Sequence, residues 1–238
     1  MIVDPGDVPV YFNNHNRLKS MRELIDWLLI AGTKRIEILD NNSTYPPLLY
    51  YYQNLPNRVR VTGLGGNFGP WAFWERGFHL QQPTPYIVSD PDLSPTDECP
   101  KDLVNRLQTL LHESGRNKVG PGLLFPGLYD NLKGWGAPAQ KRFWQDKYSE
   151  DVFIASIDTT FAIYPALSPF TQTETSLRTG RPYVLRHTSS YIHDYISREE
   201  EDYYISSASK KWSQVPANSR QARHPDPDLH DWWDRRRR

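Results

Sequence analysis

Short apolar runs alternate with amphipathic stretches over the first half of the chain, and this alternation limits its fold more than any other feature. Four of the runs are typical of buried strands: 8–12, 36–39, 59–62 and 86–89. Between the first two lies a helical pattern that starts at Ser20, where Glu23 completes a capping-box spacing, and ends at Gly32. Strands and helices that alternate at this spacing form a mostly parallel, twisted sheet with helices on both faces. The sequence therefore predicts an α/β fold of this architecture.

The second half of the chain has a weaker pattern. We expect short strands at 153–155, 159–164 and 183–186. Helices are expected at 141–149 and 198–212, and a mobile Ser/Thr-rich loop at 165–181. Residues 213–238 combine Pro, Asp and Arg without an apolar period, which is typical of a disordered or loosely docked tail. The chain is therefore expected to hold one domain, 1–212, followed by that tail.

Composition excludes several classes of protein. The chain has 28 Lys and Arg against 28 Asp and Glu, so it lacks the basic excess of a nucleic-acid-binding domain. No apolar run approaches the roughly 18 residues of a membrane-spanning helix, and the N-terminus lacks the pattern of a signal peptide. The single cysteine, Cys99, excludes an intrachain disulfide and a zinc site built from several cysteines. A reducing compartment, the cytoplasm, is the expected location.

Each of the four apolar strands in the first half ends in a polar cluster. The clusters are Asn13–Arg17, Asp40–Thr44, Gly65–Gly69 and Asp90–Asp92. In an open α/β sheet, ligands bind outside the carboxyl ends of the strands, and parallel strands bring those ends to one edge. We therefore expect a ligand site where these clusters converge.

The sharpest of the four clusters is Asp90-Pro91-Asp92. Two carboxylates at this spacing, directly after an apolar strand, can face one cavity, and Mg²⁺ or Mn²⁺ is commonly held by one or two carboxylates together with substrate phosphates. The alternative is a simple turn, because Asp and Pro are common turn residues. The same tripeptide recurs at 226–228, where no strand precedes it and a turn or disorder is expected.

The other clusters offer candidate ligand contacts with ordinary alternatives. Asp40 can accept a hydrogen bond from a base or a ribose hydroxyl, or can serve as a helix cap or turn residue. Arg17 can neutralise a phosphate, or can cap exposed backbone carbonyls. Asn67 lies among glycines that allow a close approach to a ligand, or that form an ordinary loop; neither dinucleotide-binding nor P-loop glycine patterns are present.

Two further candidates come late in the chain. Asp158 lies among apolar residues, where a carboxylate requires either a partner or a function. His187 follows an expected strand and can ligate a metal through a neutral imidazole, although a structural role is the alternative.

Together these segments resemble the GT-A glycosyltransferases, in particular the family 2-like enzymes. The resemblance covers about residues 8–212 and rests on VPVYFNNHNR (8–17), IEILDNNSTYPPLLYYY (36–52), GGNFGPW (65–71) and YIVSDPDL (86–93), with weaker support from KVGPGL, IDTTFAIY and RPYVLRH. Its most specific part is DNNST at 40–44 followed by DPD at 90–92.

The resemblance implies the GT-A fold and a metal-dependent transfer of a sugar, with inversion, from a UDP- or GDP-sugar donor to a glycan or another hydroxyl acceptor. The donor's nucleoside is expected to lie against Asn13, Asn14, Arg17 and Asp40, and Asn67 is a further candidate for binding the donor. Three side chains are expected to hold the Mn²⁺ or Mg²⁺ ion. Asp90 and Asp92 form the DxD motif, with Asp90 also near the donor, and His187 is the third ligand.

The catalytic base is expected at Asp158, with Asp151 as the second choice, because the family's glutamate-aspartate pair does not follow the Asp158 strand. Two other functions stay open. One is a non-catalytic module that binds a nucleotide sugar or a carbohydrate on the same fold. The other is a nucleotidylyltransferase, although VYFNNHNR lacks the glycines of that family's phosphate loop.

Overall fold

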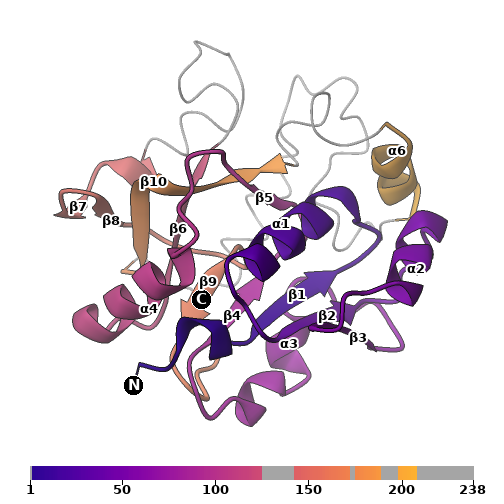
Figure 1. Cartoon of the computed structure of the whole chain (residues 1–238), viewed down its shortest axis with the longest axis horizontal. Helices are drawn as coiled ribbons and strands as arrows, with labels where there is room; N and C mark the ends of the chain where they lie inside the picture. Colours follow the sequence, from indigo (N-terminus) through magenta and orange to yellow (C-terminus); the bar gives the residue numbers. More distant parts are fainter. Residues whose placement is uncertain (1, 125–141, 172–174, 189–197, 208–238) are drawn as a thin grey trace, which may run out of the picture.

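The computed structural model describes residues 2–124, 142–171, 175–188 and 198–207. Within these ranges ten strands form one sheet, in the order β3-β2-β1-β4-β9-β6-β10-β8-β7, with β5 paired to β10 (Figure 1). The strands are β1 (Val10–Asn14), β2 (Ile36–Asp40), β3 (Val59–Gly63), β4 (Tyr86–Ser89), β5 (Leu93–Pro95), β6 (Val119–Leu124), β7 (Lys147–Ser149), β8 (Val152–Ile154), β9 (Ala162–Tyr164) and β10 (Leu177–His187). The expected tail at 213–238 lies outside the described residues.

Five α-helices and three 3₁₀ turns are described along the same ranges. They are η1 (Pro5–Asp7), α1 (Lys19–Ile30), α2 (Pro46–Gln53), α3 (Ala72–Glu75), η2 (Phe78–Gln81), α4 (Leu103–Ser114), η3 (Arg142–Trp144) and α6 (Arg198–Ser207). None of the described helices combines the length and apolarity needed to cross a bilayer.

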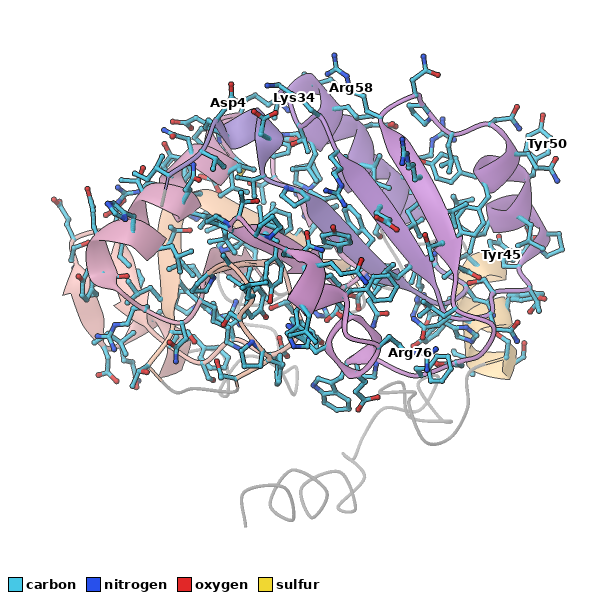
Figure 2. All side chains as sticks on the ribbon, turned by 90° about the horizontal axis from the view of Figure 1, so that it is seen from below. Asp4, Lys34, Tyr45, Tyr50, Arg58 and Arg76 are labelled. Atoms are coloured by element: carbon cyan, nitrogen blue, oxygen red, sulfur yellow. The ribbon has the colours of Figure 1, made fainter. Side chains whose placement is uncertain are left out.

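The first four long strands are parallel, as the alternation of strands and helices predicts. β1 pairs in parallel with both β2 and β4, and β2 pairs in parallel with β3. Figure 2 shows the direction of these strands: Lys34 and Arg58, which precede β2 and β3, lie along one edge, and Tyr45, which follows β2, lies toward the opposite end. The carboxyl ends therefore meet at one edge of the sheet.

The second half of the sheet is mixed. β9 runs antiparallel to β4 and β6, whereas β6 and β10 are parallel. β8 and β7 add antiparallel strands beyond β10, at the edge opposite β3. This half joins chain segments from 119 to 187 and places Asp158, between β8 and β9, near the end of β4.

Strands β1, β4 and β9 are buried on both faces, which explains their nearly continuous apolar sequence. Val10 and Phe12 of β1 pack into the larger hydrophobic core with residues of α1 and α4, while Tyr11 packs into a second core with Phe73 and Trp74 of α3. The period of two along a strand sends alternate side chains to opposite faces. Helices therefore cover both faces, as expected.

Three local expectations differ from the structure. Helix α1 has Leu18 as its N-cap, with no capping side chain, and the Ser20 hydroxyl bonds Thr188 instead of forming the expected box. Within the range expected to form a helix at 141–149, the described residues form η3 and β7. The last part of the loop expected at 165–181 is the start of β10, an eleven-residue strand.

Candidate functional site

The acidic pair Asp90 and Asp92 directly follows β4, at the edge where the parallel strands end. The chain then turns into β5, which pairs with the end of β10 and matches His187 to Leu93. This pairing brings residues almost one hundred positions apart in sequence to the same corner. The expected convergence of Asp90, Asp92 and His187 is thus present in the fold.

Asp90 lies in a strongly acidic environment. The Thr159 hydroxyl donates a hydrogen bond of 2.8 Å to its Oδ2. Burial raises the pKa of Asp90 well above its ordinary value, and the nearby carboxylates of Asp92 and Asp158 raise it further. Three carboxylates near one another repel, so this corner favours the arrival of a cation.

Asp92 is held through its backbone and leaves a carboxylate oxygen free. Its carbonyl accepts hydrogen bonds of 2.8 Å from both the Thr188 N–H and the Thr188 hydroxyl. Among the described residues, the buried Oδ1 of Asp92 has no hydrogen-bond partner, and Oδ2 lies 3.9 Å from Nε2 of His187. A buried carboxylate oxygen without a partner is costly unless something else satisfies it.

Asp158 faces the same corner and is kept ionised. Burial would raise the pKa of Asp158, but the Arg178 guanidinium, the Thr160 backbone N–H and His187 together lower it. Arg178 is buried and is fixed from β10 by hydrogen bonds to the carbonyls of Ser156, at 3.0 Å, and Pro121, at 3.2 Å. Asp158 is therefore a positioned carboxylate that can accept a proton.

The corner fits a hard divalent cation through few protein ligands. Within the described ranges, no group of three or more His, Cys, Asp or Glu side chains is arranged to hold a metal by itself. The unpartnered oxygen of Asp92 and the nearby His187 nitrogen nevertheless supply two donors suited to Mn²⁺. Such ions are often held by one or two carboxylates and completed by substrate phosphates.

The residues expected to hold a nucleoside also lie together, at the ends of β1 and β2. The Asn13 side-chain amide donates to the carbonyl of Gly69 at 2.8 Å and accepts from Asn41 at 2.7 Å. Asn14 donates to the Tyr52 hydroxyl at 2.9 Å. These bonds tie the ends of the strands to one another.

Asp40 and Asn67 each make a local bond typical of a turn. Oδ2 of Asp40 accepts from the Ser43 backbone N–H at 2.9 Å, and Oδ1 accepts from the Tyr52 hydroxyl at 2.9 Å. Asn67 accepts from the N–H of Gly69 at 3.0 Å. These contacts agree with the turn alternatives for both residues, and a donor contact by either one stays a prediction.

Helix α6 places side chains beside Arg17 that sequence reasoning did not identify. Glu201 forms a buried ion pair with Arg17, and the Tyr204 ring lies 3.7 Å from the centre of the guanidinium. Figure 1 shows α6 beside α2, at the end of the sheet where β1 and β2 terminate. No spacing in the sequence links residues 201 and 204 to Arg17, so only the fold could reveal them.

Asp151 lies elsewhere. It sits between β7 and β8 and pairs with Arg106 of α4, with an N–O distance of 2.9 Å. Asp151 is not among the carboxylates whose charges raise the pKa of Asp90. Of the two expected base candidates, only Asp158 shares the corner with Asp90 and Asp92.

Solved structures of two glycosyltransferases resemble this chain. The mannosyltransferase PcManGT from Pyrobaculum calidifontis, in complex with GDP-Man and Mn²⁺, has a TM-score of 0.52 at 12% identity, over 85% of this chain and 61% of that one. GalNAc-T7 with UDP, GalNAc and Mn²⁺ has a TM-score of 0.50 at 13% identity, over 76% and 43% of the two chains. The chain thus spans less than two thirds of either length.

Neither a protein-family model nor a curated protein sequence matches the chain. The likeness to the two solved structures therefore defines the fold. The chain has the GT-A fold that the sequence predicts, with parallel strands and covering helices.

Proposed function

We propose that this chain is a metal-dependent glycosyltransferase, which moves a sugar from a nucleoside-diphosphate sugar to an acceptor hydroxyl. The observation that carries the proposal is the acidic corner at the end of β4, where Asp90, Asp92 and Asp158 lie close together and one buried oxygen of Asp92 has no partner in the described chain. The GT-A fold, shared with enzymes solved with GDP-Man or UDP and Mn²⁺, supports the same conclusion.

In the proposed reaction, Asp92 and His187 would hold the cation, with Asp90 beside them. When bound, Mn²⁺ or Mg²⁺ would supply positive charge to the departing diphosphate. The charges of Asp90, Asp92 and Asp158 would make cation binding favourable, since they repel one another without it. The side chains of Asn13, Asn14 and Arg17, at the neighbouring strand ends, would contact the nucleoside side of the donor.

Asp158 is the proposed base. It would accept the proton of the acceptor hydroxyl as that oxygen attacks the anomeric carbon, which inverts the configuration there. Arg178, which is fixed by two backbone carbonyls, would hold the carboxylate in place. Measuring the anomeric configuration of the first product by NMR tests this assignment, since a base that activates the acceptor in one step requires inversion.

The acceptor side is proposed near α3. The segment that follows β9 packs onto this helix, with the rings of Trp74 and Phe170 4.9 Å apart. Helix α3 and residues 165–171, which follow β9, are the proposed acceptor-side elements. Both lie on the face of the sheet opposite α1 and α4.

A non-catalytic sugar-nucleotide-binding module is the second candidate. The observation that favours it is the lowered pKa of Asp158, because a carboxylate stabilised by Arg178 is a weaker base. Such a module would bind a donor without splitting it.

Donor hydrolysis tests the proposed activity. We expect slow release of UDP or GDP from a matching sugar donor in Mn²⁺, with a loss of at least about 100-fold in Asp92→Asn, because the cation loses its principal ligand. Asp97→Asn is the matched control, since Asp97 is an exposed acid five residues along the same segment. Donor binding without any hydrolysis in the wild-type protein would favour the binding module.

A further inference from the structure

Helix α6 brings a row of polar side chains to the rim of the candidate donor site. Glu200 accepts hydrogen bonds from the backbone N–H groups of Leu18, at 2.9 Å, and Lys19, at 3.1 Å, at the start of α1. Glu201 pairs with Arg17, and the Tyr203 hydroxyl donates to the carbonyl of Thr44 at 2.8 Å. The helix is thus anchored on both loops that follow β1 and β2.

Tyr204 occupies the inner side of this anchored helix. Its ring stacks on the Arg17 guanidinium, with Cζ 3.7 Å from the ring centroid, and the His15 ring meets it edge-on at 6.5 Å. A cation that is itself buried and ion-paired makes a rigid platform for an aromatic ring. The direction of the Tyr204 phenol is therefore fixed by residues 15, 17 and 201.

The Tyr204 hydroxyl makes no hydrogen bond within the described chain. The charges of Asp92 and Asp90 both act on it, which places it near the proposed cation ligands. Within the described chain, the side-chain hydrogen bonds of α6 use other side chains or the Tyr204 backbone carbonyl. Tyr204 is only partly buried, so its hydroxyl can reach a ligand.

A neutral phenol in this position acts as a hydrogen-bond donor. Burial raises the pKa of Tyr204, and the negative charges of Asp92 and Glu201 add to this effect against the opposing charge of Arg17. The hydroxyl therefore keeps its proton at neutral pH. A bound cation would engage the oxygens of the neighbouring carboxylates, so the phosphate oxygens of the donor would be the acceptors left to this hydroxyl.

We propose that Tyr204 is a donor-contact residue, whose hydroxyl donates a hydrogen bond to the diphosphate of the bound nucleotide sugar. This inference rests on the proposed function, since it names a further residue of the same site. Hydrogen bonds to charged acceptors are stronger than neutral ones. Removing this one should therefore weaken nucleoside-diphosphate binding by about 10- to 100-fold.

Calorimetric titration of UDP and GDP, each with Mn²⁺, tests the proposal on the full chain. Tyr204→Phe keeps the ring on Arg17 and removes only the hydroxyl, so we expect the loss of affinity stated above. Tyr203→Phe is the matched control, because it makes the same change one residue away at a hydroxyl bonded to Thr44. Its affinity should stay within about twofold of the wild type, as expected for an exposed neutral hydrogen bond.

The outcomes separate this inference from the proposed function. Equal affinity in Tyr204→Phe and the wild type would overturn the role of Tyr204 and leave the glycosyltransferase proposal standing. If the wild type binds neither nucleotide, both proposals fail.

A second measurement covers the case in which Tyr204→Phe does not fold. Amide hydrogen exchange across 200–207 in the wild-type chain should slow when the binding nucleotide and Mn²⁺ are added, because the ligand ties α6 to the site. Unchanged or faster exchange there would overturn the inference.

Discussion

Lys118 carries an amino group into the interior of the molecule. The residue is fully buried, and Nζ lies 2.5 Å from the carbonyl oxygen of Ile157 and 4.4 Å from the centre of the Phe170 ring. Burial lowers the pKa of Lys118 to about 7, and the attraction of Asp158 offsets only part of this effect. The folded protein therefore binds one proton less than the unfolded chain between about pH 7 and the ordinary lysine pKa of about 10.4.

The pH dependence of stability follows from this difference. Because the unfolded state binds more protons in that range, the free energy of unfolding should rise as the pH rises from about 7 toward 10. Burial of Lys118 lowers the free energy of unfolding at neutral and acidic pH. This cost disappears once the pH is high enough for the lysine to be neutral in the unfolded chain as well.

We predict that Lys118→Met stabilises the protein at pH 6 by a few kcal/mol relative to wild type, and that the gain shrinks as the pH approaches 10. Urea denaturation of both proteins at several pH values measures it. Lys101→Met is the control, because Lys101 is an exposed lysine resting on the Trp27 ring. A constant difference across the pH range would contradict the depressed pKa.

A second prediction at the scale of the residue concerns Asp158. Asp158→Asn should lower the rate of sugar transfer by about 100-fold or more, since the acceptor loses its base, and should leave the donor Kd nearly unchanged. Steady-state kinetics and donor titration measure the two quantities. Asp151→Asn, in which the half-exposed pair with Arg106 is lost, should transfer at nearly the wild-type rate. Near-normal transfer by Asp158→Asn would show that the base is not there.

Helix α1 depends on α6 for its N-terminal cap. No side chain of α1 or of its N-cap residue satisfies the first N–H groups, and Glu200 accepts from two of the backbone groups at this end. A carboxylate at a helix N-terminus also interacts favourably with the helix dipole. This contact joins two helices that lie about 180 residues apart in the sequence.

We predict that Glu200→Ala lowers the free energy of unfolding by about 1–2 kcal/mol, which is the cost of losing a good cap. Thermal or urea unfolding measures the change. Glu199→Ala, on the same helix but exposed, should change it by less than about 0.5 kcal/mol. Equal effects of the two substitutions would mean that the cap contributes little.

The elements of the first half could be predicted because their signals are local. The runs at 36–39, 59–62 and 86–89 match β2, β3 and β4 within one residue, and Pro46 is the first residue of α2, a position that proline favours. Each of these elements carries its signal, an apolar strand pattern or a residue typical of a helix start, within its own short stretch of sequence.

The strand expected at 183–186 is the last part of β10, but the first part of β10 was not predicted, because its stability comes from distant groups. Buried Arg178 and Thr179 interrupt any apolar pattern, and they are satisfied by the carbonyls of Pro121, Ser156 and Tyr183. β5 was missed for a similar reason, since three residues ending in proline form a strand only because β10 runs beside them. Pairing between distant strands leaves little trace in a short sequence window.

For the whole molecule, the position of the candidate site could be predicted better than its chemistry. Parallel strands fix which ends meet, so the approach of Asp90, Asp92 and the Asn13–Arg17 loop followed from the order of elements alone. Three features depend on side chains brought together by β10 and α6: the Asp92 oxygen without a partner among the described residues, the guanidinium beside Asp158 and the position of Tyr204. Those contacts required the structure.

Thermal unfolding with Mn²⁺ and a nucleoside diphosphate tests the central claim, a cation-assisted donor site at Asp92. A ligand at 100 times its Kd adds about 2.7 kcal/mol to folding stability, which corresponds to a rise in Tm of roughly 5–10 °C for a protein of this size. We predict this rise for the wild type only when Mn²⁺ is present with UDP or GDP, and its loss in Asp92→Asn but not in Asp97→Asn. A rise of the same size without metal, or one retained in Asp92→Asn, would contradict the account.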